Sequence, residues 1–408
     1  MVDFNITIDN KEIDGESLSF DIKGNQETGL HKSIINSLRR TLLSSIPTIS
    51  FRTDIDDSDI TIVTNTTSLH NEFLLHRIAL LPIYLNPDEF KKQYLFYLKV
   101  ESDNTIPLKT ITAKDFMIYP LKENIDSKEV KLEFYDLTSP LNEKQKEEIF
   151  KPFVFKNEKE YCIITELKST NTEETKQQLE LYGSPSISYS YENSRWCAVS
   201  CATYSFKKDN NLFKKVLKEK ISVNNIPEEK QSSYEKELYI SESERYFFRD
   251  NYIEPNYYEF KIDSVHFMNP KELFIQSNEI MIQQIQILKD EFPKISSGEK
   301  SILELKSNKE NVYEIIVNGF DDTIGNIFQS FISRYMINDE SIFSMCGYKK
   351  THPLEEIIII YLTLNINNEI SKSNTNQKIF HIIKELQETC DHLINLYALI
   401  KKEAEKEL

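Results

Sequence analysis

The sequence predicts an α+β fold in which one strand–turn–helix unit occurs twice. Apolar residues alternate through residues 18–22 and again through residues 313–317. This period of two is typical of a half-buried strand, and in both places a glycine, Gly29 or Gly319, then marks the turn into a helix. A unit that one chain uses twice indicates two halves that pack on each other as a pseudo-dimer.

The two copies align without a gap when Gly29 is laid over Gly319. Matching positions carry similar residues: Leu30 and Phe320, Ser33 and Thr323, Ile34 and Ile324, Asn36 and Asn326, Leu38 and Phe328. The first helix is predicted to end at Ile46-Pro47, because proline cannot donate a helical hydrogen bond and restricts the residue before it. Asp321, Asp322 and Thr323 are predicted to cap the second helix, where side-chain oxygens meet free backbone amides.

Two further helices are predicted from apolar residues at steps of three and four. One covers about residues 270–291, and the other lies near the carboxyl end, with a stripe sustained over three heptads. Such a stripe is the seam of a left-handed helix pair. We expect all four helices to pack into a layer behind the strands. The predicted apolar interface between the halves consists of Ile34, Leu38, Leu42, Ile285, Leu288, Ile324, Phe328, Leu386, Leu393 and Tyr397.

The region between the repeats is irregular and polar from about residue 85 to 180. Strand-like fragments at 94–100, 131–135 and 161–164 indicate a mixed, mostly β insertion on one side of the core fold. Pro293–Gly298 has the composition of a short linker. The predicted domains are a discontinuous first domain, an inserted domain and a second domain: 1–50 plus 255–295, 51–254, and 296–408.

Composition limits the classes of function. The chain has 408 residues, of which 49 are basic and 65 acidic, giving a net charge of −16. This balance repels a phosphate backbone, so we expect no direct binding of nucleic acid. The most basic cluster is diluted by acids and lacks interleaved aromatic residues, so solvent or an acidic neighbour is favoured over nucleic acid. It consists of Lys207, Lys208, Lys214, Lys215, Lys218 and Lys220.

The chain is predicted to be intracellular and reduced. Its five cysteines form no regular framework, and the amino terminus has no charged-then-apolar signal segment. The longest aliphatic run, residues 357–362, is far shorter than the roughly 20 residues that span a bilayer. We therefore expect a buried strand there and no association with a membrane.

Several groups resemble metal or catalytic sites only in part. His70, Glu72 and His76 are spaced by two and six, which does not place both imidazoles on one helical face. Residues 54–59 begin like a calcium loop but lack the glycine at the sixth place. Cys197 and Cys201 have no second pair. With 8 glycines and no phosphate loop or Ser/His/Asp arrangement, we predict no metal, no cofactor and no catalytic residue.

Arg39 and Arg40 are the strongest candidates for a functional role. They are adjacent on a helix whose apolar face carries Ile34, Leu38 and Leu42, so both cannot point into the core. At least one guanidinium therefore faces outward, where its donors can recognise a partner. The alternative is a solvated helix end, where cations suit the helix dipole. The residues alone leave these two interpretations open.

These residues also resemble a known family. Residues 36–40, 46–48 and 65–82 look like the alpha-type assembly subunit of cellular RNA polymerases, the bacterial alpha, archaeal D and nuclear third-largest subunit type. Residues 322–326 and 347–354 are similar to the small partner subunit that pairs with it. The resemblance implies two dimerisation domains, each an antiparallel sheet with helices, fused into an intramolecular pseudo-heterodimer.

Arg195 and Trp196 extend the resemblance, because a basic-Trp-x-Pro-x-Ala strand is typical of the alpha-like subunit. The sequence departs from that pattern at Cys197 and Ala198, where a small residue and proline are common. Fusions of the two subunits are known from large DNA viruses of eukaryotes. The resemblance therefore implies a viral origin, with the protein in the virion and in the host cytoplasm or nucleus.

The function implied by the resemblance is a non-catalytic assembly platform of a DNA-dependent RNA polymerase. Its partners would be the largest, second-largest and small subunits, with magnesium and zinc held in other chains. The docking residues would be Asn36, Arg39, Arg40, Arg77, Arg195 and Trp196. Two alternatives are a metal-dependent hydrolase using His70, Glu72 and His76, and a nucleic-acid-binding accessory factor.

Overall fold

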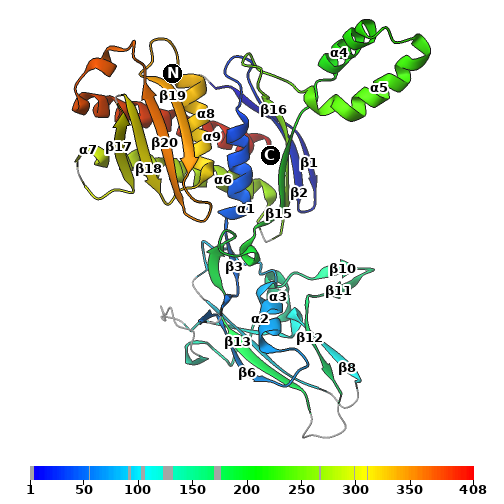
Figure 1. The fold of residues 1–408 in the computed structure, drawn as a ribbon. Helices are drawn as coiled ribbons and strands as arrows, with labels where there is room; N and C mark the ends of the chain where they lie inside the picture. The colour runs from blue at the N-terminus through cyan, green and yellow to red at the C-terminus, as the bar shows by residue number, and fades with distance from the viewer. Residues whose placement is uncertain are drawn as a thin grey trace. The chain divides into compact units, whose positions relative to one another are not determined.

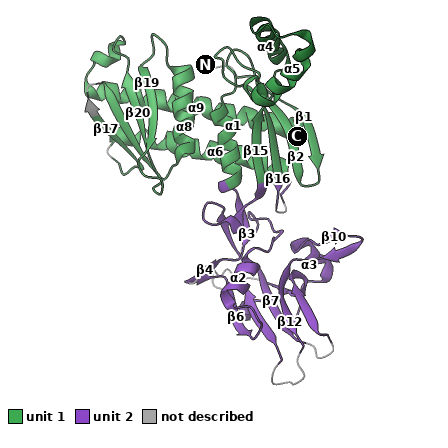
Figure 2. Cartoon of the chain, turned by 45° about the vertical axis from the view of Figure 1, so that its right-hand side comes forward, with its two compact units in different colours: residues 1–43, 201–263, 270–408 green, residues 44–200, 264–269 purple. Residues whose placement is uncertain are grey.

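The computed structural model divides into two compact units, which Figure 2 shows in different colours. Unit 1 contains Met1–Leu43, Cys201–Asp263 and Pro270–Leu408, and unit 2 contains Ser44–Ser200 and Ser264–Asn269. The predicted α+β class is confirmed. The residues that the structure describes are 4–54, 56–90, 93–102, 106–122, 132–169, 176–265, 268–297, 299–309 and 311–408.

The first half of unit 1 is a four-stranded sheet with two helices. The sheet has the order β1-β2-β16-β15, and α1 follows β2 while α6 follows β16. Buried and exposed residues alternate along much of β2 and β16, because one face of the sheet is covered by helices. The elements are β1 (Ile6–Asp14), β2 (Ser17–Gly24), α1 (Lys32–Ser44), β15 (Val199–Phe206), β16 (Tyr257–Ser264) and α6 (Pro270–Glu291).

The second half of unit 1 repeats this arrangement. Its sheet has the order β17-β18-β20-β19, with α8 after β18 and α9 after β20. Both halves therefore run strand, strand, helix, strand, strand, helix, and in both the fourth strand lies beside the second. The elements are β17 (Leu303–Lys309), β18 (Val312–Asn318), α8 (Asp322–Phe331), β19 (Phe343–Lys350), β20 (Ile357–Leu364) and α9 (Thr375–Glu407).

The four helices lie between the two sheets, as Figure 1 shows. The longest pair, α6 and α9, runs antiparallel: Lys271 Nζ donates to the Glu405 carbonyl at 3.0 Å, while Lys289 pairs with Asp391 at 2.5 Å. The start of α6 thus lies beside the end of α9, and the end of α6 lies beside the middle of α9. The aliphatic run at 357–362 lies in β20, between β18 and β19, which confirms the predicted buried strand.

Two segments are inserted into the first half. One is unit 2, which follows α1, and the other is a helical hairpin of α4 (Asn210–Val223) and α5 (Glu228–Glu242) between β15 and β16. The sequence predicts one inserted domain over the whole of 51–254. In the structure residues 201–263 belong to unit 1, because β15 is a strand of its first sheet.

The predicted linker also has structure. Within it, α7 forms a single turn at Lys294–Ser297, and Gly298 lies outside the described residues. Ser301 and the backbone N–H of Ile302 donate to the Glu291 carboxylate at 2.7 and 3.2 Å. The connection between the two halves is therefore held against the end of α6.

Unit 2 is built on a four-stranded sheet of order β6-β13-β7-β9 with α2 and α3. The predicted strand at 94–100 is β7. The fragment at 131–135 is not a strand: Leu132–Phe134 is a 3-10 turn, and residue 131 lies outside the described part. At 161–164 only the last two residues belong to β12. These elements are α2 (Asn71–Ala79), α3 (Glu143–Ile149), β6 (Ile60–Asn65), β7 (Tyr94–Glu101), β9 (Met117–Pro120), β12 (Ile163–Lys168) and β13 (Gln178–Gly183).

Unit 2 also contains four pairs of short strands. β8 pairs with β12, β3 with β14, β10 with β11 and β4 with β5. Apart from β12, these strands are β3 (Pro47–Ser50), β4 (Thr53–Asp54), β5 (Asp57–Ser58), β8 (Leu108–Thr112), β10 (Phe153–Phe155), β11 (Glu158–Glu160) and β14 (Ser186–Tyr189).

Among the described helices of the whole chain, none combines the length and the apolar character that crossing a bilayer requires.

Candidate functional site

The two repeated turns depend on glycine for the same reason. Gly29 has φ +69° and Gly319 has φ +80°, a left-handed conformation that strains residues with a side chain. Their surroundings differ. A Cβ on Gly29 would lie 2.2 Å from Asp250 Oδ2 and 2.5 Å from Arg334 Nη2, whereas nothing lies within 4 Å of one on Gly319. The first turn is therefore closed by side chains from elsewhere in unit 1.

The two repeated helices are capped at equivalent positions. Asp321 Oδ1 accepts a hydrogen bond from the Thr323 N–H at 2.9 Å, which confirms the predicted cap. At the matching position His31 Nδ1 accepts from the Ser33 N–H at 3.2 Å. Burial, followed by the nearby Arg334 charge, lowers the pKa of His31 to about 4. The imidazole is therefore neutral at pH 7, and its Nδ1 is free to accept.

The contacts between α1 and α8 are reciprocal. Arg40, near the end of α1, donates to Asp321 at the start of α8 at 2.5 Å. Ser330, which aligns with Arg40, meets Ser33 at the start of α1, with 2.6 Å between the hydroxyl oxygens. Such an exchange, in which the end of each copy touches the start of the other, is the pattern of a two-fold interface. The helices that carry Asn36 and Asn326 are thus in contact.

The helix α1 also contacts the two long helices. Thr41 Oγ1 donates to the Met281 sulfur of α6 at 3.1 Å. Ser37 Oγ donates to the Ile34 carbonyl and lies 2.6 Å from the Tyr397 hydroxyl of α9. Burial raises the pKa of Tyr397, so its hydroxyl stays protonated and can donate to Ser37. Two polar pairs therefore fix the register of an otherwise apolar contact.

All residues of the predicted apolar interface are buried, none more than 3% exposed. They are Ile34, Leu38, Leu42, Ile285, Leu288, Ile324, Phe328, Leu386, Leu393 and Tyr397. Each lies on α1, α6, α8 or α9, the four helices between the sheets. Aromatic contacts add to this core, since the rings of Phe292 and Phe328 lie 6.3 Å apart. The position of these residues is consistent with an interface between the halves.

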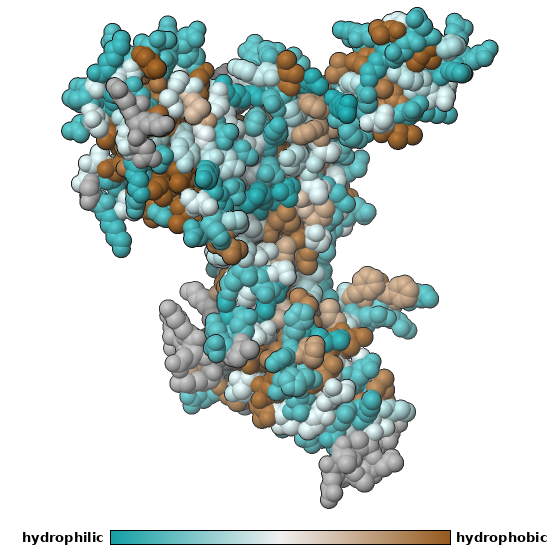
Figure 3. Space-filling model, viewed as in Figure 1, coloured by the Kyte–Doolittle hydropathy of each residue, from teal (hydrophilic) through white to brown (hydrophobic). Residues whose placement is uncertain are grey.

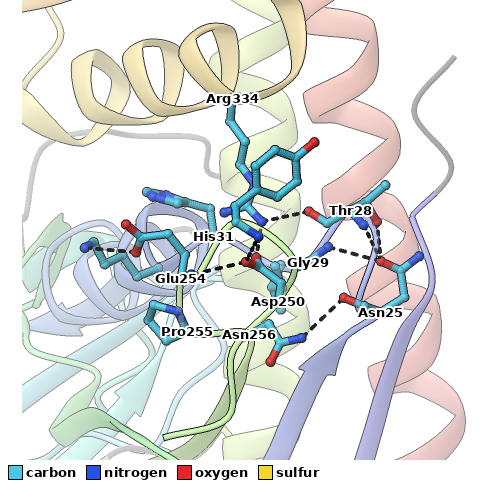
Figure 4. A network of polar contacts seen from close by, with 12 residues as sticks. Asn25, Thr28, Gly29, His31, Asp250, Glu254, Pro255, Asn256 and Arg334 are labelled. Atoms are coloured by element: carbon cyan, nitrogen blue, oxygen red, sulfur yellow. Dashed lines mark hydrogen bonds and ion pairs between the residues drawn. The ribbon is translucent and has the colours of Figure 1, made fainter. Parts of the chain in front are cut away.

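A buried ion pair joins the second half to the first turn (Figure 4). Arg334, in the π-helical turn after α8, pairs with Asp250, and their side chains are only 7% and 0% exposed. Arg334 Nη2 also donates to the Thr28 carbonyl at 3.0 Å, and the neighbouring Tyr335 hydroxyl donates to the same oxygen at 2.7 Å. The second half thereby holds the backbone directly before Gly29.

Backbone N–H groups of the following loop orient the Asp250 carboxylate for this contact. Its Oδ1 accepts from the N–H groups of Tyr252 and Glu254 at 2.8 and 3.1 Å, which leaves Oδ2 for Arg334. The Tyr252 ring covers the guanidinium, with its centroid 4.5 Å from the Arg334 Cζ. Both carboxylate oxygens therefore accept hydrogen bonds, whereas the Arg334 Nε–H is buried without an acceptor among the described residues.

The predicted docking residues of α1 are partly exposed. Arg39 Nε donates to Asn36 Oδ1 at 3.0 Å, and no carboxylate pairs with Arg39 among the described residues. Arg40 differs, because its guanidinium is committed to Asp321. Arg39 is therefore the arginine of the pair whose charge is available to another molecule.

The other predicted docking residues lie in unit 2. Arg77 is exposed on α2 and donates to the Ile163 carbonyl at 2.9 Å. Arg195 has a side chain only 7% exposed, with hydrogen bonds to the Phe51 carbonyl and the Thr53 hydroxyl at 3.1 and 2.8 Å. Trp196 is fully buried.

Trp196 has an internal role. The guanidinium groups of Arg52 and Arg195 lie 5.0 and 5.2 Å from its ring centroid, a geometry of cation–π contacts. Its indole N–H donates to the Ser186 carbonyl at 3.4 Å. A buried ring offers no surface to a partner, so Arg195 and Trp196 shape unit 2 from within.

The described residues contain no group of three or more His, Cys, Asp or Glu side chains placed to hold a metal. His70, Glu72 and His76 are all exposed, at the start and along α2. Asp250 and Arg334 are not predicted from the sequence. Their one sequence signal is that Arg334 lies in the continuation of the second copy, where a cation replaces Ser44.

Comparison with known proteins agrees with this architecture. Residues 26–285 match the family described as RNA polymerase Rpb3/Rpb11 dimerisation domain. The chain is 32% identical over 94 residues to DNA-directed RNA polymerases I and III subunit rpac1 of Dictyostelium discoideum, which is 23% of this chain and 22% of that protein. It is 31% identical over 87 residues to subunit RPAC1 of Homo sapiens, or 21% of this chain and 22% of the relative.

These alignments span about a fifth of each relative. The family match is longer and covers more than half of the chain, beginning before the Gly29 turn and ending within α6. It therefore contains α1, all of unit 2 and the strands β15 and β16. The chain belongs to the family of the RNA polymerase Rpb3/Rpb11 dimerisation domain.

Proposed function

We propose that this protein is a non-catalytic assembly subunit of a multisubunit DNA-dependent RNA polymerase. The observation that carries the proposal is the reciprocal contact of two halves with one topology in a chain of a dimerisation family. A dimerising scaffold acts through recognition surfaces and needs no reacting groups. Its partners would be the largest and second-largest subunits, together with small subunits of the same enzyme.

The second half would replace a separate partner subunit. Residues 296–408 contain a complete copy of the repeated topology, and they follow the family match rather than falling within it. Joining two such domains makes their pairing intramolecular and raises the effective concentration to roughly millimolar for a short connection. The fused pseudo-heterodimer would thus form at any concentration of the chain. The viral origin implied by the resemblance stays a prediction.

The docking surface in unit 1 would centre on Arg39 and Asn36. Arg39 is held by Asn36 through Nε, so the two terminal nitrogens of its guanidinium can face a carboxylate of a large subunit. Arg77, in unit 2, would be a separate docking residue. Arg40 would act mainly between the halves, because Asp321 already binds it.

Affinity purification of the tagged full-length chain from its own cells tests the proposal. The wild-type chain should recover the large polymerase subunits, identified by mass spectrometry. Arg39→Glu should reduce their recovery at least about tenfold, because it turns an attractive contact into a repulsive one. The matched control is Lys402→Glu, a reversal at an exposed position of α9.

Two results would contradict the proposal in different ways. Recovery of no polymerase subunit by the wild-type chain would remove the assembly function. Full recovery by Arg39→Glu would leave that function in place but reject the docking surface on α1. Arg40 is left unchanged in this experiment, since reversing its charge would also disturb the contact with α8.

A further inference from the structure

The β10–β11 ribbon in unit 2 exposes three large apolar side chains in succession. Phe153, Val154 and Phe155 are 68%, 61% and 51% exposed. Figure 3 shows apolar side chains along this ribbon at the surface. Within the described residues, β10 pairs only with β11. An exposed, apolar strand with an open edge is an aggregation hazard that proteins normally cover or charge.

The two faces of the ribbon differ. The pairs across it are Phe153 with Glu160, Val154 with Lys159, and Phe155 with Glu158. Since side chains alternate along a strand, one face carries both phenylalanines and both glutamates, and the other carries Val154 and Lys159. The aromatic face is therefore flanked by carboxylates along its whole length.

The ribbon is a regular hairpin with one face attached to α3. Its two turn residues, Lys156 and Asn157, have φ +48° and +67°, as in the two-residue turn that matches the twist of a hairpin. On the other face, Lys159 Nζ binds the Glu147 carboxylate of α3 at 2.6 Å, and the Tyr161 hydroxyl donates to it at 3.1 Å. These contacts turn the Lys159 face towards α3 and the aromatic face away from it.

The charges next to the rings limit what can cover them. No ion pair involves Glu158 or Glu160 in the part of the chain that the structure describes. One cation, Lys156, lies at the tip, with its Nζ 5.1 Å from the centre of the Phe155 ring. Two carboxylates repel a phosphate backbone or an anionic lipid surface, and they attract lysine and arginine. A basic protein surface therefore fits this face best.

We propose that the β10–β11 ribbon inserts Phe153 and Phe155 into an apolar pocket with a basic rim on another protein chain of the complex. The inference rests on the proposed assembly function and names a second contact, separate from α1. Aromatic anchors in a desolvated pocket are the usual centres of binding energy. A preformed ribbon loses little entropy when it binds, and Glu158 and Glu160 orient it through ion pairs at the rim.

Photocrosslinking in the assembled complex tests this surface. The photoreactive residue p-benzoylphenylalanine replaces Phe153 in the tagged full-length chain, and the purified complex is irradiated. We expect a crosslink to another protein chain, at a peptide that contains apolar residues beside lysine or arginine. Adding Glu158→Lys and Glu160→Lys should lower the crosslink yield at least about tenfold, because the rim then repels.

The matched control carries two reversals on α5, Glu228→Lys and Glu229→Lys, which should leave the crosslink unchanged. An assembled complex that shows no crosslink from position 153, or a crosslink only to nucleic acid or to a second copy of this chain, would overturn the inference while the assembly function stands. Equal loss in the control would also overturn it, since the effect would then be nonspecific. If the wild-type chain recovers no complex, the assembly function fails and this inference with it.

Discussion

The two halves of unit 1 have one topology but use their central helices differently. At the start of each helix a side chain accepts a hydrogen bond from the backbone N–H two residues later. The acceptor is His31 at α1 and Asp321 at α8. Further along, α1 has Arg39 where α8 has Gln329. The shared positions maintain the fold, while the cation that we propose for docking is present in only one copy.

The outer faces of the two sheets differ as well. In the first sheet, burial opposes ionisation of Asp21, but hydrogen bonds from Lys207, Asn10 and Tyr257 hold its pKa below the usual value. On the second sheet, Ile316 and Ile359 pair on the side away from the helices. The helix-facing sides thus follow one pattern, whereas the outer faces have diverged. Pseudo-symmetry is confined to the surfaces that the halves need for each other.

The largest expected effect comes from the buried ion pair between the halves. Arg334→Met should lower the free energy of unfolding by about 3–5 kcal/mol, because it leaves the Asp250 carboxylate buried without its partner. Arg40→Met, at the 40%-exposed pair with Asp321, should cost less than about 1 kcal/mol. Urea denaturation of both variants measures the difference. Equal losses would mean that burial does not distinguish the two contacts.

The turn glycines offer a second, matched comparison. Gly29→Ala should cost about 2–4 kcal/mol, because left-handed strain is added to a clash with Asp250 and Arg334. Gly319→Ala should cost only about 1–2 kcal/mol, since it meets strain alone. The same denaturation experiment compares them. If the Gly319 variant were at least as unstable as the Gly29 variant, the close packing of Asp250 and Arg334 against Gly29 would be contradicted.

The helix caps predict a smaller, pH-dependent effect. The pKa of His31 falls from 6.5 to about 4 in the folded chain, so the unfolded state binds the proton first as the pH decreases. The contribution of His31 to the free energy of unfolding is complete above pH 6.5 and is lost as the pH falls towards 4. Between pH 7 and 5 the loss should be about 2 kcal/mol.

His31→Asn is the control for this effect. Asparagine keeps an acceptor for the Ser33 N–H but does not titrate. The free energy of unfolding of this variant should fall by about 2 kcal/mol less than that of the wild type over the same pH range. Identical pH profiles would show that His31 is not the responsible group.

Local chemistry made part of this structure predictable. Strand periodicity and the two glycines identified the repeat, and Asp321 could be predicted as a cap because capping involves only neighbouring residues. The apolar helix stripes likewise placed all ten interface residues in the core. Each of these signals is contained within a few turns of chain.

Other features depend on residues far apart in sequence. Asp250 and Arg334 are joined across a sequence separation of 84, and neither lies in a periodic pattern. The sequence does not predict that β15 belongs to the first sheet, because a helical hairpin separates it from β16 along the chain. The sequence predicts Arg195 and Trp196 at the surface, but the Arg52 side chain lies over the Trp196 ring, and the Phe51 carbonyl and the Thr53 hydroxyl bind Arg195. Tertiary contacts alone decide such cases.

The reciprocal end contacts of α1 and α8 constrain the length of both helices. One residue inserted between Ser33 and Arg40 would rotate the end of α1 by about 100° and advance it by about 1.5 Å. The guanidinium would then miss Asp321, while Ser330 would still reach Ser33. Insertions are thus tolerated in the loops of the first half, where unit 2 and the α4–α5 hairpin are found, but not within its central helix.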